Sequence, residues 1–279
     1  MKIRTVGIVG QGFVGTALRE VFSCYYKVYT YDKAHEHLST HKSVTALAYD
    51  CDVVFVCVPT PMKSDGSCDT SIVEKVCRSA CETGRQNIVV IKSTVPPGTT
   101  SYLNEVCRDS QIVFNPEFLL ERNASEDFRN TDRVILGGPR PATTRLKQFY
   151  ANIFPKASII KTDSTIAEYV KYLTNCFLAV KVSVANEFAS MCQENGVDSD
   201  KVVEYAVHDR RLGDSHWAVP GPDGHFGFGG SCFPKDLNAL IHHSIKAGVP
   251  ANTLVGAWNT NLNVRPEKDW EELKGRAVQ

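Results

Sequence analysis

Cys232 is the residue whose setting in the sequence most clearly indicates chemistry. It follows the glycine-rich stretch Gly227-Phe-Gly-Gly-Ser, and Leu237, Leu240, Ile241 and Ile245 then recur at helical spacing. With Pro234 suited to the first helical position, we expect a helix to begin at the cysteine. The unpaired N–H groups and the dipole at a helix start favour thiolate over thiol, and Lys235 adds a positive charge. The pattern therefore predicts a nucleophile, although a lone cysteine is often a buried structural residue.

The glycines before Cys232 suggest where a substrate would lie. Gly227, Gly229 and Gly230 carry no side chain to keep a ligand away from the backbone, so a substrate can approach it. Gly229 is our candidate substrate contact in this stretch.

A second candidate site lies near the N-terminus. The apolar run 5–9 ends in a glycine turn, and a helical pattern follows. Such glycines permit the tight turn, let a pyrophosphate approach the backbone and allow a helix to pack closely on a strand. The expected cofactor contacts in the turn are Gly10, Gly12, Phe13, Val14 and Gly15. The strand-like run 28–31 ends at Asp32, near the usual spacing of about 20 residues, where a carboxylate binds ribose hydroxyls and repels a 2′-phosphate. We therefore expect NAD, and not NADP.

Strand and helix patterns alternate through the first half of the chain. Further strands are predicted at 52–58, 88–91, 112–114, 133–136 and 158–161, with a helix at 72–81. This alternation is typical of an α/β fold with a doubly wound parallel, Rossmann-like sheet. We expect an NAD-binding domain over residues 1–163 and a helical dimerisation domain carrying the cysteine over residues 164–279.

Polar residues follow several of the predicted strands, at the edge where ligands bind in such sheets. Thr60 and Thr94 are candidate cofactor or water contacts, and each hydroxyl could equally serve a turn. Glu117 and Glu121 come four residues apart after a strand end, so they could share one helical face.

A long helical pattern runs from Thr165 to about residue 195. Thr165 and Glu168 have the spacing of a capping box. Lys171 and Asn175 share a face and could hold an oxyanion, unless that face is simply solvated. The helix is too long for one small domain to cover, so we expect its apolar face to form a homodimer.

Composition excludes several classes of protein. The chain has 279 residues, 43% hydrophobic, with Lys+Arg and Asp+Glu both at 31, so no overall basic charge points to nucleic acid or an anionic membrane. No targeting segment or membrane span is recognisable, and we expect a cytoplasmic protein. The ten cysteines are scattered irregularly, and neither they nor the histidines have metal-ligand spacing, so we expect reduced thiols and no metal.

Taken together, these motifs resemble the UDP-glucose/GDP-mannose dehydrogenase family, most nearly its UDP-glucose 6-dehydrogenases. The resemblance is carried by residues 10–15, 92–96, 115–121, Lys171 with Asn175, and above all by 227–236. It implies oxidation of a nucleotide-sugar alcohol to a carboxylate in two steps, with two NAD per turnover.

The resemblance also implies roles for single residues. Cys232 is similar to the family nucleophile that captures the aldehyde as a thiohemiacetal, which the second hydride transfer converts to a thioester. The other residues that match catalytic or substrate positions are Lys171 and Asn175 for the oxyanion, Asp236 and Glu117 for water, and Thr94 as a water-holding hydroxyl. The residues that match positions near the cofactor are Val14, Asp32, Thr60, Glu121 and Lys235. The family's second cofactor lysine falls near His37, so Lys33 is expected in its place.

The chain departs from the family pattern at its C-terminus. Related chains continue for a further domain of about 100 or more residues, a usual domain size, that binds the nucleotide base. Three explanations fit this departure: the further domain is a separate UDP-binding polypeptide, the chain is a natural short form, or it is truncated. The nucleotide sugar that the protein uses stays open.

Two other functions fit parts of the sequence. β-Hydroxyacid and 6-phosphogluconate dehydrogenases combine similar domains but perform one hydride transfer without a nucleophilic cysteine, so the stretch around Cys232 argues against them. A catalytically impaired NAD-binding remnant is the non-enzymatic alternative.

Overall fold

Seven strands form one sheet in the first of two units of this computed structural model. The structure describes residues 2–107 and 110–279, and the first unit comprises those within 1–60 and 69–171. The strands are β1 Thr5–Val9, β2 Lys27–Tyr31, β3 Val53–Val56, β4 Ile88–Ile91, β5 Gln111–Phe114, β6 Arg133–Gly137 and β7 Ser158–Thr162. Their order in the sheet is β2-β1-β3-β4-β5-β6-β7. The chain reverses its direction of winding between β1 and β3, where ligands bind in folds of this kind.

Strand direction confirms the predicted Rossmann-like sheet with one difference. The five strands from β2 to β5 are parallel, as are β6 and β7 to each other. β5 and β6 are antiparallel and pair only through Phe114 and Gly137, the last residues of each. Hydrophobic patterning could not reveal this, because a buried strand has the same pattern in either direction.

Helices cover both faces of the sheet. One core contains residues of α1 Phe13–Phe22, α5 Ala124–Arg129 and α6 Arg140–Ile153. The other contains residues of α2 Val44–Asp50, α3 Ser71–Cys81 and α4 Thr99–Val106. In β3 the side chains alternate between the two cores, Val53 and Phe55 in the first and Val54 and Val56 in the second, as the pleat requires.

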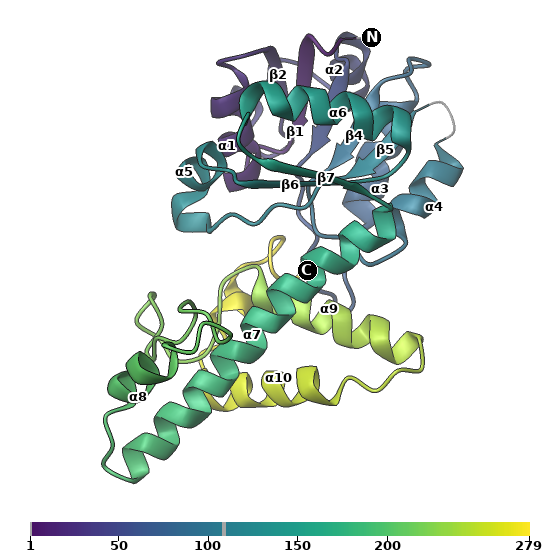
Figure 1. The fold of residues 1–279 in the computed structure, drawn as a ribbon. Coiled ribbons are helices and arrows are strands. Elements are labelled where there is room, and N and C mark those ends of the chain that lie inside the picture. The colour runs from purple at the N-terminus through teal and green to yellow at the C-terminus, as the bar shows by residue number, and fades with distance from the viewer. Residues whose placement is uncertain (1, 108–109) are drawn as a thin grey trace. The chain divides into compact units, whose positions relative to one another are not determined.

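The second unit, residues 61–68 and 172–279, is mainly helical. Its core joins Tyr172, Cys176, Phe228 and Leu237, with Trp258 packed against them. The helices are the larger part of α7 Ser164–Glu194, then α8 Ser199–Ala206, α9 Phe233–Lys246 and α10 Asn252–Val264 (Figure 1). Short 3-10 helices lie at η1 Glu36–Leu38 and η2 Glu121–Asn123 in the first unit and at η3 Asp269–Glu272 in the second. None of the helices that the structure describes is both long and apolar enough to cross a membrane.

The start of α7 differs from the expected capping box at Thr165. The N–H of Thr165 donates to Asp163 Oδ1 at 2.8 Å, so Asp163 supplies the cap. Glu168 instead accepts hydrogen bonds from the N–H groups of Gly98, at 2.6 Å, and Thr100, at 2.9 Å, at the N-terminus of α4. Burial raises the pKa of this carboxyl, and the bonds to α4 offset only part of that effect.

Candidate active site

Cys232 is the N-cap residue of α9, as the sequence predicts. Its carbonyl oxygen accepts the first hydrogen bond of the helix from the Asp236 N–H at 3.0 Å. The thiol is half-buried, and the Ser231 hydroxyl lies 3.8 Å from the sulfur. The first N–H groups of a helix have no partner within it, and at this position they favour a negatively charged sulfur.

Three polar side chains gather in the first turn of α9 and on α7. Asp236 is 1% exposed, and its Oδ2 accepts a hydrogen bond from Asn175 Nδ2 at 2.6 Å, while Oδ1 pairs with the Lys235 ammonium. Burial lowers the pKa of Lys235, but the charges of Asp236 and Cys232 outweigh it and the net pKa is raised. Lys235 therefore stays cationic beside the thiol, which stabilises a thiolate.

A second cluster, in the first unit, is built around Glu117. Lys171 Nζ donates to the Glu117 carbonyl oxygen at 2.6 Å and pairs with Oε1 at 3.1 Å, and both side chains are buried. Burial raises the pKa of Glu117, but Lys171, the Leu119 N–H and Lys92 outweigh it, so the pKa is lowered. The carboxylate is thus ionised and can accept a proton or a hydrogen bond.

Lys92 contacts the same segment through the residues before Glu117, a role not predicted above. Its Nζ donates to Asn115 Oδ1 at 3.1 Å and to the Pro116 carbonyl oxygen at 3.3 Å, and Tyr150 donates to Asn115 Oδ1 at 2.5 Å. Burial lowers the pKa of Lys92 to about 8, although the neighbouring Cys57 and Glu117 oppose the shift. In the sequence, the feature that could have indicated this role is the position of Lys92, a charged residue directly after the fully apolar strand β4.

These residues line part of a small cavity in the first unit. Its volume is about 110 Å³, and its walls include Lys92, Asn115, Glu117, Arg133 and Tyr150. The space reaches one side of the Glu117 segment and is large enough for a few water molecules at most.

The stretch from Glu117 to Glu121 does not form the helical face that the spacing suggested. Residues 115–120 contain no helix, and Glu121 opens the 3-10 helix η2 with an exposed side chain. Leu120 is extended, with φ of −84° and ψ of +127°, and the Glu117 carboxylate accepts a hydrogen bond from the Leu119 N–H at 2.7 Å. The two acids therefore have different surroundings, one buried and one exposed.

The glycine turn of the first unit has the geometry of a pyrophosphate site. Gly10 has φ of +92°, and a Cβ on Gly15 would stand 1.9 Å from the Gly10 carbonyl oxygen, so both positions require glycine. Gly12, the N-cap of α1, has no atom within 4 Å of a Cβ position. The N-terminus of α1 is thus open at Gly12 to an anion.

Asp32 lies at the end of β2 and is fixed by the main chain. Its Oδ2 accepts from the Gln11 N–H at 2.6 Å, and its Oδ1 accepts from the N–H groups of Ala34 and His35, both at 2.8 Å. Burial raises the pKa of Asp32, but these hydrogen bonds outweigh it and lower the pKa overall. A fixed carboxylate next to the glycine turn can accept hydrogen bonds from a ribose.

The remaining predicted residues are divided between the two units. Thr60 and Thr94 are buried just beyond the carboxyl ends of β3 and β4. Phe13 and Val14 are half-buried in the first turn of α1, and Lys33 is exposed after Asp32. In the second unit, a Cβ on Gly229 would meet Arg265 and Asp269, whereas Gly230 has no atom within 4 Å of that position.

Two family models match the chain. The NAD binding domain of the UDP-glucose/GDP-mannose dehydrogenase family matches residues 25–154, and the central domain of the same family matches residues 165–263.

Individual relatives agree with these matches. A UDP-glucose 6-dehydrogenase of Pseudomonas aeruginosa is 38% identical over 218 residues, which are 74% of this chain and 47% of that protein. The structure of a UDP-glucose dehydrogenase from Pyrobaculum islandicum superimposes with a TM-score of 0.84 at 28% identity, covering 98% of this chain and 71% of that one. A Mycobacterium tuberculosis 3-hydroxyisobutyrate dehydrogenase has a TM-score of 0.76 over 96% of this chain and 95% of its own, but at 16% identity it shows the fold alone. The chain spans about half the length of the curated relatives it matches.

Proposed function

Because the chain belongs to the UDP-glucose/GDP-mannose dehydrogenase family, whose cofactor is NAD, we propose that it oxidises UDP-glucose to UDP-glucuronate. The reaction removes two hydrides from the primary alcohol carbon of the sugar and passes through an aldehyde. When bound, NAD would supply the acceptor for one hydride in each oxidation. The chain's own residues would hold the substrate, stabilise charge and supply the sulfur nucleophile.

The residues around the glycine turn fit this cofactor. Gly12 leaves the N-terminus of α1 open for a pyrophosphate, and the fixed Asp32 carboxylate can accept hydrogen bonds from the adenosine ribose. The same negative charge opposes the 2′-phosphate of NADP. Thr60, Lys33 and Glu121 would make further contacts with the cofactor.

In the first oxidation, Lys171 and Asn175 would stabilise the sugar oxygen as its proton leaves. They lie four residues apart on α7, one a cation and the other an amide donor. A positive charge and an N–H aimed at an oxyanion lower its energy most where water is excluded, and both side chains are buried.

In the second oxidation, the Cys232 thiolate would add to the aldehyde carbon. The resulting thiohemiacetal oxygen is again an oxyanion, and loss of hydride converts it to a thioester. Water then attacks the thioester carbon, the C–S bond breaks, and the carboxylate and the thiol are released. Glu117 and Asp236 would orient the water and accept its proton, with Thr94 as a further hydrogen-bonding group.

The observation that carries this proposal is the position of Cys232 as N-cap of α9 beside the Lys235 cation. The test counts NADH formed per UDP-glucose consumed, with the chain alone and with an added C-terminal domain of a relative. Two NADH per sugar supports the proposal. One indicates a single-step alcohol dehydrogenase, as in the enzymes of similar fold, and none despite NAD binding indicates a remnant.

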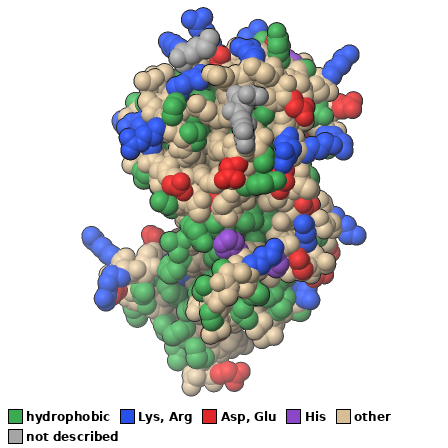
Figure 2. All heavy atoms as spheres, turned by 90° about the vertical axis from the view of Figure 1, so that its right-hand side faces the viewer, with side chains coloured by type: hydrophobic (Ala, Val, Ile, Leu, Met, Phe, Trp, Pro, Cys, Tyr) green, Lys and Arg blue, Asp and Glu red, His purple; other side chains and the backbone are tan. Residues whose placement is uncertain are grey.

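Two copies of the chain would also form a homodimer through α7. Large apolar side chains stay exposed along α7 at helical spacing, with Leu173 at 69% and Phe177 at 63%; the others are Ile166, Tyr169, Val184, Phe188 and Met191. Figure 2 shows hydrophobic side chains gathered along one side of the second unit. A stripe of this length on one helix is suited to packing against a second copy.

A further inference from the structure

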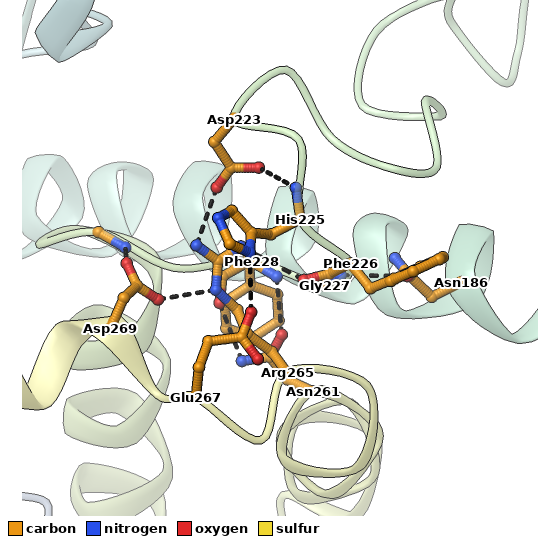
Figure 3. Close-up of polar contacts among 11 residues, drawn as sticks. Asn186, Asp223, His225, Phe226, Gly227, Phe228, Asn261, Arg265, Glu267 and Asp269 are labelled. Atoms are coloured by element: carbon orange, nitrogen blue, oxygen red, sulfur yellow. Dashed lines mark hydrogen bonds and ion pairs between the residues drawn. The ribbon is translucent and has the colours of Figure 1, made fainter.

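The backbone before Cys232 is held by side chains from three other elements. Asn186 on α7 accepts a hydrogen bond from the Gly227 N–H at 3.0 Å. Asn261 on α10 is fully buried, accepts from the Phe228 N–H at 2.7 Å and donates to the Phe228 carbonyl oxygen at 2.9 Å. The segment 226–230 is thus fixed mainly by side chains instead of by regular secondary structure (Figure 3).

Arg265 is the centre of this network. Its guanidinium is 3% exposed and donates in three directions: to Asp269 Oδ1 at 2.7 Å, to Asp223 Oδ2 at 2.9 Å and to the Phe226 carbonyl oxygen at 3.3 Å. Asp269 in turn accepts from the Gly230 N–H at 2.8 Å through its other oxygen. One buried cation therefore connects both ends of the segment (Figure 3).

The glycines of the segment make room for these side chains. A Cβ on Gly229 would stand 2.4 Å from Arg265 Nη2, and a Cβ on Gly227, where φ is +66°, would stand 2.4 Å from Asn261 Oδ1. Two of the three glycines are therefore explained by the network. A planar guanidinium with fixed donor directions is suited to this position, and a lysine ammonium cannot make the same set of contacts.

We propose that Arg265 is a positioning residue that fixes the segment 226–230 and, through it, the Cys232 thiol. The proposal rests on the function proposed above for that thiol. Arg265 acts through Asp269 and Gly230, two residues before the cysteine, and does not touch the reacting atoms. Small displacements of a reacting group have large effects on rate, so a loosened segment would slow the thiol-dependent step.

Amide hydrogen exchange tests the first part of the proposal without any turnover. The variants are Arg265→Lys and Arg265→Gln, and the matched control is Glu267→Ala, which removes the partner of His225 in an exposed pair of the same network. In the Arg265 variants, exchange in peptides covering 224–232 should rise about tenfold or more while the middle of α10 stays protected. The control should exchange like the wild type. Unchanged exchange at 224–232, or an equal rise throughout the second unit, overturns the proposal.

Alkylation of Cys232 and product analysis test the link to the thiol. At about pH 9.5, above the ordinary thiol pKa of about 8.5, the alkylation rate reports access to the sulfur. It should rise at least about threefold in Arg265→Lys. With UDP-glucose and NAD, this variant should release more aldehyde per carboxylate at unchanged KM for NAD. A wild type without turnover, both alone and with an added C-terminal domain of a relative, would refute the proposed function alone, since exchange and alkylation still decide the role of Arg265. Unaltered alkylation in a variant with loosened exchange overturns the link to the thiol.

Discussion

Lys171 Nζ contacts Glu117 twice, at 2.6 Å from its main-chain oxygen and 3.1 Å from its carboxylate, and both side chains are buried. Such a pair costs desolvation energy, and removing one partner leaves the other charge uncompensated. The pair therefore links the stability of the first unit to the arrangement of two residues proposed to act on the substrate.

Lys171→Met should lower the free energy of unfolding by about 3 to 5 kcal/mol, measured by urea unfolding, and the double variant with Glu117→Gln should lose less than the sum of the two single changes. The pKa of Glu117 is lowered in the folded state, so its stabilisation is present at neutral pH and is lost as the pH falls through the folded-state value. Arg129→Gln, which breaks the exposed pair with Glu20, is the control and should cost less than about 1 kcal/mol. Equal losses in Lys171→Met and the control would contradict the buried pair.

Lys92 should make stability depend on pH in the alkaline range. Its pKa is about 8 in the folded chain against 10.5 for the unperturbed group. Between these values the unfolded chain binds more protons, so the contribution of Lys92 to stability rises with pH.

The measurement is the difference in unfolding free energy between wild type and Lys92→Met from pH 7 to 10. This difference should shift in favour of the wild type by the order of 3 kcal/mol. The control, Lys156→Met at an exposed position, should give a difference that does not vary with pH. A flat or falling difference for Lys92 would refute the effect of burial.

NAD should bind at least about tenfold more tightly than NADP, and Asp32→Ala should weaken NAD binding and reduce this preference together. The physical reason is the fixed carboxylate, which favours ribose hydroxyls and repels a phosphate. Calorimetric titration of both cofactors tests this, with Asp50→Ala, an exposed acid of the same unit, as the control. Equal affinities for the two cofactors in the wild type would remove Asp32 from this role.

The exposed stripe on α7 should keep the protein dimeric. Light scattering of the wild type should give twice the chain mass of 30.9 kDa at micromolar concentration, and Leu173→Glu with Phe177→Glu should give the single mass. Ile245→Glu, at a position on α9 that is 68% exposed, is the control and should stay dimeric. A monomeric wild type would rule out the proposed dimer.

The sequence was informative where a local pattern determines the structure. The alternation of strands and helices, the glycine turn, the strand that ends at Asp32 and the helix that begins after Cys232 all follow from periodicity and from residues with special backbone preferences.

The sequence was less informative where a side chain acts at a distance in the chain. Glu168 caps α4 instead of its own helix, and Arg265 and Asn261 reach back more than 30 residues to the segment before Cys232. No spacing rule predicts such contacts, because they depend on how the helices pack. Lys92 was visible only as a charge after an apolar strand, and its low pKa results from burial by distant residues.

The most direct test of the proposed mechanism compares the products of wild type and Cys232→Ser by mass spectrometry, with UDP-glucose and NAD, and with an added C-terminal domain of a relative if the chain alone is inactive. A serine hydroxyl is a far poorer nucleophile and leaving group than a thiolate at neutral pH. We predict that the wild type forms UDP-glucuronate, and that the variant binds NAD normally but accumulates the aldehyde or a covalent adduct with little carboxylate. Formation of UDP-glucuronate by Cys232→Ser at the wild-type rate would contradict the mechanism and make Cys232 a structural residue.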